Sequence, residues 1–220
     1  MMYPKGNIKI PASHGHLEAI LKMPKDKVKG VALVCHPHPL GGGTMHNKVV
    51  YRAAAGLADA GLAALRFNFR GVGNSTGEHD EGDGEIQDVL DALDYLSSNF
   101  AGEPITLAGF SFGSRVGTEV GMGDDRVVRL ISIGTPVDKY RDYGFLKNLR
   151  KPILFVHGDK DEFGSVANLN ELVAEVSAVT DAEVVIFQNC GHFFDGHLSR
   201  LRDAVHDWVL EKMAEAAQAA

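Results

Sequence analysis

Short apolar runs and longer amphipathic segments follow one another along this chain, and each kind predicts a different element. Short runs rich in Val, Ile, Leu and Phe, bounded by Gly, Pro or polar residues, are typical of strands, whereas apolar residues spaced three and four apart are typical of helices. Strands are predicted at 8–13, 16–24, 29–36, 62–71, 105–109, 129–136, 152–158 and 182–192. Helices are predicted at 49–61, 86–96, 114–120, 165–179 and 197–213.

Strands and helices alternate through most of the chain, which favours an α/β fold. We expect a mostly parallel central sheet of about eight strands with helices on both faces. In such sheets, ligands bind where loops leave the carboxyl ends of the strands. A chain of 220 residues, 45% of them hydrophobic, suits a single domain over residues 1–220.

The charge balance argues against nucleic acid and anionic membranes as partners, because the net charge is −7 at neutral pH. Much of the acidity falls between Glu78 and Asp94, where it is interpreted as acid near a helix N-terminus and along the solvated face of that helix. The N-terminus lacks the basic and apolar pattern of a leader, and no apolar stretch approaches the ~20 residues that span a bilayer. We therefore expect a cytoplasmic protein, with Cys35 and Cys190 as free thiols.

The segment Gly-Phe-Ser-Phe-Gly at 109–113 joins a predicted strand to a predicted helix. Ser111 therefore lies on a sharp turn, where the two glycines let strand and helix approach closely and the helix amides can stabilise a negative charge. The same spacing of glycines surrounds Ser75, but the acidic, glycine-rich residues 78–84 that follow cannot begin a helix packed on a sheet. Ser111 is thus the candidate nucleophile.

A loop rich in glycine and proline follows the third predicted strand and runs from His36 to Lys48. Its position allows a main-chain amide to point at a reacting carbonyl oxygen. Pro37 and Pro39 carry no amide hydrogen, so the candidate donors are the amides of His38 and Leu40. Of these two, His38 is favoured.

The histidines of this loop offer a second interpretation, a metal site built from His36, His38 and His46. His14 and His16 lie at an N-terminal hairpin turn and are interpreted as turn residues, because no carboxylate or cysteine stands beside them at ligand spacing. We expect neither a metal nor a cofactor.

A serine hydroxyl becomes a good nucleophile only when an imidazole takes its proton and a carboxylate orients that imidazole. Residues 158–164, Gly-Asp-Lys-Asp-Glu-Phe-Gly, follow a predicted strand and offer Asp159 and Asp161. His192 stands at the end of the last predicted strand, and His197, in the first turn of the last predicted helix, competes weakly with it. The order along the chain is therefore Ser, Asp, His.

This order and spacing resemble the α/β-hydrolase superfamily. The segments that carry the resemblance are HPHPLGGG, NFRGVGNSTG, GFSFG, HGDKDEFG and CGHFF, and they span most of the chain. Within the superfamily the chain looks like the small, lidless enzymes similar to dienelactone hydrolase. Lids are usually inserted between the strands predicted at 129–136 and 152–158, and the segment present there is too short to form one.

The resemblance implies a role for each candidate residue. Ser111 would be the nucleophile and His192 the base, while the amides of Phe112 and His38 would form the oxyanion hole. Asp161 would be the acid, because the superfamily's acid follows a glycine and two variable residues, and Asp159 stays the alternative.

The implied activity is that of a carboxylesterase-like serine hydrolase, which acts on small carboxylic esters through an acyl-enzyme. Dienelactone hydrolases carry a cysteine nucleophile, so Ser111 counts against dienelactone as the substrate, and Cys190 is interpreted as a buried thiol near the site. A thioesterase, small amidase or lactonase would use the same residues. An alternative of a different class is a non-catalytic binding protein with this fold.

Without a lid, few apolar walls can cover an acyl chain, so we expect short acyl groups. The residues expected to line the acyl side, together with Phe112, are Leu40, Val72, Pro136, Val137 and Phe163.

Overall fold

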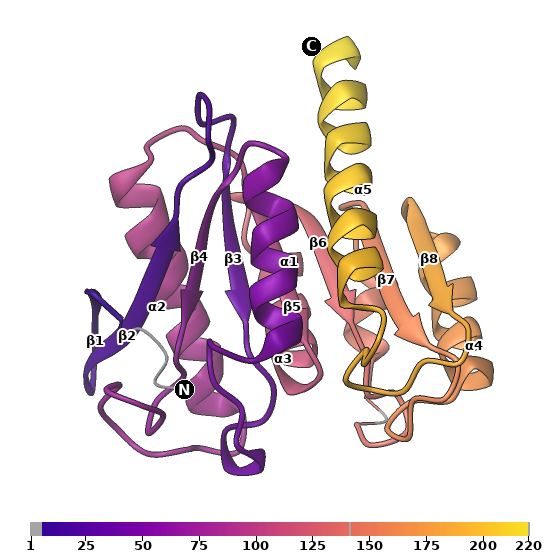
Figure 1. Cartoon of the computed structure of the whole chain (residues 1–220), viewed down its shortest axis with the longest axis horizontal. Coiled ribbons are helices and arrows are strands. Elements are labelled where there is room, and N and C mark those ends of the chain that lie inside the picture. Colours follow the sequence, from indigo (N-terminus) through magenta and orange to yellow (C-terminus); the bar gives the residue numbers. More distant parts are fainter. Residues whose placement is uncertain (1–5, 141, 220) are drawn as a thin grey trace.

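An eight-stranded sheet forms the centre of the molecule (Figure 1). The computed structural model describes residues 6–140 and 142–219. The strands are β1 (Ile8–Ala12), β2 (Gly15–Lys22), β3 (Val31–Cys35), β4 (Ala63–Phe67), β5 (Ile105–Phe110), β6 (Val127–Ile133), β7 (Ile153–Gly158) and β8 (Ala182–Phe187). Their order is β1-β2-β4-β3-β5-β6-β7-β8, with β3 to β8 parallel and β1 and β2 antiparallel at one edge. The predicted mostly parallel sheet of about eight strands is confirmed.

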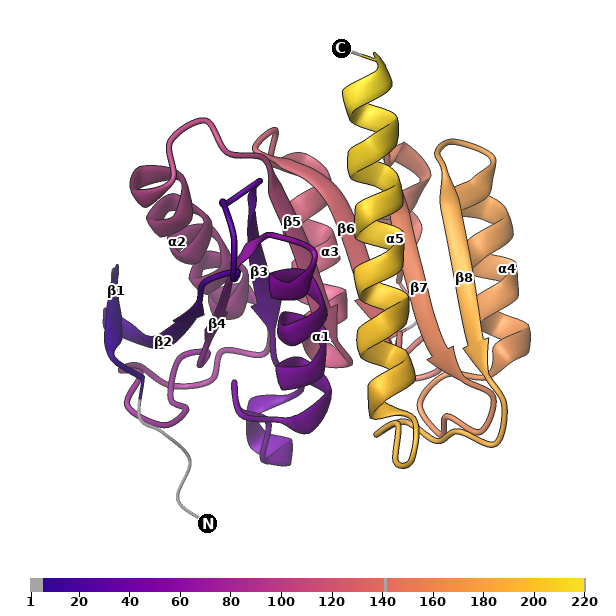
Figure 2. The ribbon, with the colours of Figure 1, turned by 45° about the horizontal axis from the view of Figure 1, so that its top comes forward.

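Helices cover both faces of the sheet, as predicted (Figures 1 and 2). One face packs against α1 (Lys48–Asp59) and α5 (Leu198–Ala219), and the other against α2 (Asp83–Asn99), α3 (Phe112–Gly123) and α4 (Val166–Ser177). Successive strand residues point to opposite faces, so in β3 Val34 belongs to the α1 side and Leu33 to the α2 side. Both faces of the central strands are apolar, which accounts for their continuous apolar runs.

Several strands end earlier than the sequence predicted, and the differences are largest for β4 and β8. After β4, the amides of Phe69 and Arg70 donate to the side chains of His36 and Asp88, so they no longer pair with a neighbouring strand. After β8, Asn189 adopts a left-handed conformation with φ 55°, which breaks the extended backbone. The residues that follow each strand therefore belong to loops at the carboxyl edge of the sheet.

The acidic run before and within α2 is only partly solvated, so its interpretation as a solvated face is wrong for two residues. Glu85 and Asp88 are fully buried. Asp88 accepts hydrogen bonds from the amide and guanidinium of Arg70, and it lies 3.1 Å from Nε2 of His14. Glu85 accepts from the amide of Gly82. Hydrogen bonds to these buried carboxylates hold the turn after β4 and the β1–β2 hairpin against α2.

The short segment between β6 and β7 carries a single 3₁₀ turn, Gly144–Asn148, and no lid in the part that the structure describes. Among the described residues, no helix is long and apolar enough to cross a membrane. The expectation that the chain has no leader rested in part on residues 1–5, which lie outside the described residues. The helix α5 continues six residues beyond the predicted end at 213, to Ala219.

The second serine with flanking glycines has a structural role. Ser75 accepts a hydrogen bond from the amide of Glu18 and donates one to the carbonyl of Asn68, with distances of 2.8 and 2.7 Å. The Glu18 carboxylate is also buried and accepts from Asn68, from both nitrogens of Asn74 and from the amide of Gly6. The turn around Ser75 is therefore held to β2, and its hydroxyl is already engaged.

Replacing Glu18 with glutamine should lower the free energy of unfolding by about 1–3 kcal/mol at pH 7, because an amide nitrogen would then face hydrogen-bond donors. Burial alone would raise the pKa of Glu18, but the hydrogen bonds from Asn74, Gly6 and Asn68 outweigh it and hold the pKa below its ordinary value. A lowered pKa in the folded state adds stability above the ordinary pKa of about 4.3, and this is lost as the pH falls through the folded-state pKa.

Urea unfolding of both proteins at pH 7 and at about pH 3 measures this effect. The difference between wild type and Glu18→Gln should shrink at the lower pH. Glu211→Gln, on the exposed side of α5, is the matched control and should change stability by less than about 0.5 kcal/mol. A difference that is equal at both pH values would contradict the prediction.

Candidate active site

Ser111 lies on a tight turn between β5 and α3. Its backbone has φ 56° and ψ −121°, a conformation that costs free energy for any residue with a Cβ. The flanking glycines make the turn possible: a Cβ on Gly109 would lie 2.1 Å from the carbonyl oxygen of Gly113, and one on Gly113 would lie 2.4 Å from that of His36. Strand, helix and the loop after β3 thus crowd together, and the serine projects at the carboxyl edge of the sheet.

Three side chains form a continuous hydrogen-bonded chain at this edge. Nε2 of His192 lies 2.9 Å from Oγ of Ser111, and its Nδ1 lies 2.7 Å from Oδ2 of Asp161. The Asp161 side chain is fully buried and that of His192 is 2% exposed. A carboxylate beside Nδ1 favours the tautomer with its proton there, which leaves the lone pair of Nε2 facing the serine hydroxyl.

The rings of Phe163 and Phe110 hold the imidazole of His192 in place. Their centroids lie 4.6 Å and 4.8 Å from that of His192. Packing of this kind restricts the rotation of the imidazole. The loop after β8 can therefore present His192 in a fixed orientation although it lies five residues beyond the strand.

The two aspartates after β7 point to different partners. Asp161 faces His192, and its other oxygen accepts from the amide of Phe163 at 2.9 Å. Asp159 accepts from the amide of Cys190 at 3.0 Å, and hydrogen bonds from the amides of Cys190 and Asn189 lower its pKa. Asp161 thus hydrogen-bonds to His192, whereas Asp159 holds the loop after β8 in place.

The remaining candidates for the acid–base chemistry lie apart from Ser111. His197 precedes α5 and its ring packs near that of Phe187, with centroids 5.9 Å apart. Cys190 is buried, and burial raises the pKa of its thiol to about 11, so the thiol is protonated at neutral pH. A protonated thiol is a poor nucleophile.

The loop after β3 folds back on itself and leaves one of its candidate amides available. The carbonyl of His38 accepts from the amides of Gly41 and Gly43, both at 3.0 Å. The amide of Leu40 donates to Nδ1 of the His38 ring at 3.2 Å and is therefore engaged. Within the described residues, the amides of His38 and Phe112 donate no hydrogen bond.

The alternative of a metal site in this loop is wrong for the residues that the structure describes, since they contain no group of three or more side chains placed to hold a metal ion. His36 is fully buried, with Nδ1 at 2.6 Å from the carbonyl of Pro37 and Nε2 accepting from the amide of Phe69. Burial lowers the pKa of His36 to about 4, so it is neutral at pH 7. It fixes the loop instead of binding a ligand.

A second histidine and carboxylate pair, which the sequence did not reveal, lies behind the loop after β3. Nδ1 of His79 lies 2.8 Å from the buried carboxylate of Glu85. The His79 ring lies 4.9 Å from that of His38 and 5.9 Å from that of Phe112, measured between centroids. The His79–Glu85 pair thus lies against the side chains of His38 and Phe112, the two residues whose amides are available.

The cavity at Ser111 has a volume of about 260 Å³. Its wall is made by Pro37, His38, Gly41, Gly42, Gly43, Asn47, Ser111, Lys139, Phe163, His192 and Phe193. Sequence reasoning missed Lys139 and Phe193, although Lys139 lies two residues after Val137 and Phe193 directly follows His192, both of which it had singled out.

Of the six residues expected to line the acyl side, Phe163 lies in the wall of this cavity and the other five do not. Phe112 lines a separate cavity beside α3. Leu40 projects from a 3₁₀ turn and is 75% exposed. Val72 and Pro136 are buried beneath the loops that carry them. Val137 lines a different cavity. Sequence position after a strand placed these residues at the correct edge but could not tell which way each side chain points.

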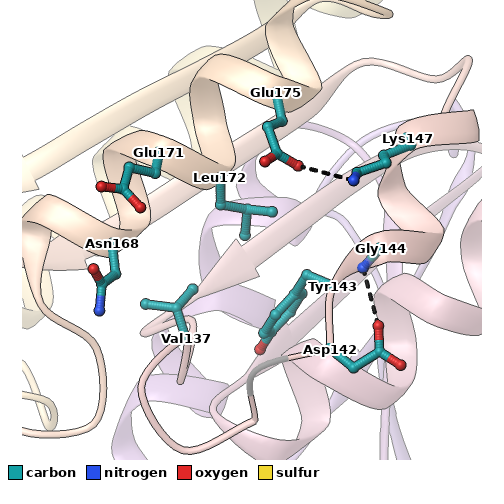
Figure 3. A pocket seen from close by; sticks show the side chains of 9 residues that line it. All are labelled: Val137, Asp142, Tyr143, Gly144, Lys147, Asn168, Glu171, Leu172 and Glu175. Atoms are coloured by element: carbon teal, nitrogen blue, oxygen red, sulfur yellow. Dashed lines mark hydrogen bonds and ion pairs between the residues drawn. The ribbon is translucent and has the colours of Figure 1, made fainter.

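A larger cavity, about 610 Å³, lies between α4 and the 3₁₀ turn Gly144–Asn148 (Figure 3). Val137, Leu172 and Tyr143 form its apolar part, and Lys147 pairs with Glu175 across its rim at 3.8 Å. Neither Ser111 nor His192 contributes to its wall. Size alone would therefore point to the wrong cavity for the chemistry.

Known proteins with this fold are similar to the chain in sequence and in structure. A family model for the alpha/beta hydrolase domain matches residues 30–220. An alpha-beta serine hydrolase homologue from Coxiella burnetii is 37% identical, and the structures match with a TM-score of 0.83 over 94% of this chain and 97% of that chain. A serine hydrolase without a lid from Xanthomonas campestris is 30% identical, with a TM-score of 0.82 over 94% of this chain and 95% of that chain.

A curated protein of Rickettsia prowazekii, described as uncharacterized, is 36% identical over 187 residues, which is 82% of this chain and 78% of that protein. The similarity thus extends over nearly the whole sheet and its helices. On the match of the family model and on these identities, the chain belongs to the alpha/beta-hydrolase family.

Proposed function

We propose that this protein is a serine hydrolase that cleaves small carboxylic esters through an acyl-enzyme. The observation that carries the proposal is the hydrogen-bonded chain from Ser111 through His192 to Asp161, at the wall of a cavity at the carboxyl edge of the sheet. The relatives described as serine hydrolases support the reaction class. The ester substrate rests on the site alone.

In the proposed mechanism, Nε2 of His192 takes the proton of Ser111 while Oγ attacks the ester carbonyl. The buried carboxylate of Asp161 stabilises the imidazolium that forms. His192 then gives the proton to the departing alcohol, which leaves the acyl group on Ser111. Water, activated by the same imidazole, hydrolyses this acyl-enzyme and restores the serine.

Negative charge develops on the carbonyl oxygen during attack. The amides of Phe112 and His38 are the proposed donors to it, because both are available and both adjoin the turn that carries Ser111. Phe112 also begins α3, so the positive end of the helix dipole adds to the stabilisation.

Labelling with a fluorophosphonate probe tests the proposal, since the probe forms a covalent bond with an activated serine. Mass spectrometry should find the label on Ser111, and the loss of labelling in His192→Ala would link it to the base. A panel of matched esters, thioesters, amides and lactones then separates the esterase from the thioesterase, amidase and lactonase alternatives. An unlabelled, folded protein would favour the non-catalytic binding protein.

Catalytic efficiency on p-nitrophenyl esters should peak at acyl chains of about two to four carbons. Each methylene removed from water contributes about 0.8 kcal/mol, and a cavity of about 260 Å³ without a lid can cover few of them. Measurement of kcat/KM across a chain-length series checks this. A maximum at eight carbons or longer would mean that the chain has an apolar groove beyond the cavity at Ser111.

A further inference from the structure

Among the described residues that form the wall of the cavity at Ser111, one side chain has a permanent charge, Lys139. The other polar side chains of the wall are Asn47, His38 and the reacting Ser111 and His192. Among the described residues, no carboxylate lines this cavity, although the chain as a whole carries a net charge of −7. The charge that a ligand would meet on the described side chains of the wall is therefore that of the Lys139 ammonium.

Lys139 has no counter-ion in the described part of the chain. The adjacent Asp138 points elsewhere, since its carboxylate accepts from the amide of Ser165 at 2.7 Å and from the side chain of Asn168. The ammonium of Lys139 lies 5.4 Å from the centre of the Tyr140 ring and 5.8 Å from that of Phe163. Aromatic faces attract a cation but do not neutralise it.

The charge of Lys139 acts on the reacting region. Burial, followed by the charge of Lys139, lowers the pKa of His38, whose amide is a proposed donor to the substrate oxygen. On its other side, Lys139 adjoins Phe163, whose ring packs against that of His192 at 4.6 Å. The charge of Lys139 thus reaches His38, and its ammonium lies near Phe163, the ring that packs against His192.

The carboxylates around the cavity are engaged or lie outside its wall. The side chain of Asp161 is fully buried and hydrogen-bonded to His192. Glu85 is fully buried and pairs with His79. Glu81 lines a separate cavity beside Phe112, next to Tyr140. A ligand in the cavity at Ser111 would therefore meet the ammonium of Lys139 without meeting an opposing carboxylate.

We propose that Lys139 makes the site selective for esters that carry a carboxylate or a similar anionic group close to the scissile bond. This rests on the proposed function, because the anion would be placed by the same cavity that holds the ester carbonyl. Lys139 is exposed to solvent, so a carboxylate would exchange part of the hydration of the ammonium for an ion pair, while a neutral ester of the same shape would gain no such pair.

Binding of two boronic acids tests the proposal without turnover, because a boronic acid forms a tetrahedral adduct with an activated serine. The pair is 4-carboxyphenylboronic acid and 4-carbamoylphenylboronic acid, which differ mainly in charge. Wild type should bind the carboxylate about 2- to 5-fold more tightly, because Lys139 is exposed and its charge is screened by solvent, and the preference should weaken as salt is added. Titration calorimetry gives both affinities.

Three variants decide whether Lys139 causes the preference. The ratio of the two affinities should fall to about one in Lys139→Met and below one in Lys139→Glu. Lys147→Met is the matched control, since Lys147 is exposed on the same segment but belongs to the wall of the other cavity, and it should keep the wild-type ratio. Equal ratios in wild type and all three variants would overturn the proposal.

Two pairs of esters show on which side of the scissile bond the anion lies. Monoethyl glutarate and its carbamoyl analogue place the charge on the acyl side, and 4-carboxyphenyl and 4-carbamoylphenyl acetate place it on the alcohol side. The pair whose ratio of kcat/KM depends on Lys139 identifies the side, and independence in both pairs counts against the proposal. If wild type is labelled by the fluorophosphonate but shows no charge preference, the role of Lys139 is refuted and the proposed function stands. If folded wild type neither labels nor binds a boronic acid, the proposed function is refuted as well.

Discussion

Replacing Ser111 with alanine should reduce ester turnover by about 10⁵- to 10⁶-fold, because the nucleophile acts as one unit with its base and acid. The fold should survive, since Oγ of Ser111 bonds to no described residue other than His192, and alanine and serine have similar backbone preferences at φ 56°. Measurement of kcat together with a thermal unfolding curve separates loss of chemistry from loss of structure.

Ser75→Ala is the matched control for this variant. Ser75 has the same flanking glycines, but its hydroxyl joins Glu18 and Asn68. Its loss should cost about 1–3 kcal/mol in the free energy of unfolding and leave the turnover of the folded protein unchanged. Loss of turnover in Ser75→Ala with retention in Ser111→Ala would refute the assignment of the nucleophile.

Replacing Asp161 with asparagine should lower kcat by about 10³- to 10⁴-fold. One oxygen of Asp161 accepts from the amide of Phe163, so an asparagine would keep its oxygen there and turn its NH₂ group toward His192. Nδ1 would then have to accept a hydrogen bond, which moves the imidazole proton to Nε2. In that tautomer His192 cannot take a proton from Ser111.

Asp159→Asn separates this electronic effect from damage to the loop. Asp159 lies two residues away and accepts from the amide of Cys190, a bond that the asparagine oxygen can retain. We expect a loss of less than about tenfold in kcat, because the loop that carries His192 would be held less firmly. The reverse ranking of the two variants would move the acid to Asp159.

The parallel sheet could be predicted because its strands are buried on both faces and read as apolar runs between glycine and proline turns. Ser111 could be singled out because its turn requires glycine on both sides at close approach. The choice between Asp159 and Asp161 could not be made from spacing alone. Both follow the same strand, and which carboxylate faces His192 depends on how the turn after β7 rotates each side chain.

Contacts between loops that lie far apart in the chain could not be predicted from the sequence. The burial of Glu85 and Asp88 depends on Arg70, His14 and His79, which the fold brings to α2 from other elements. The cavity wall likewise combines side chains from several loops, so a residue such as Leu40 can lie at the correct edge and still face solvent. Hydrophobic periodicity carries no signal for either arrangement.

The proposed reacting groups come from the loops after β5, β7 and β8, so the site assembles only when widely separated parts of the chain have met. Ser111 and His192 lie 81 residues apart in sequence, and His192 and Asp161 lie 31 apart. Such non-local contacts form late in folding, because closing long loops costs entropy before any contact is gained. Hydrolytic activity recovered after dilution from denaturant would therefore follow completion of the sheet, and the rate of that recovery would report the last steps of its assembly.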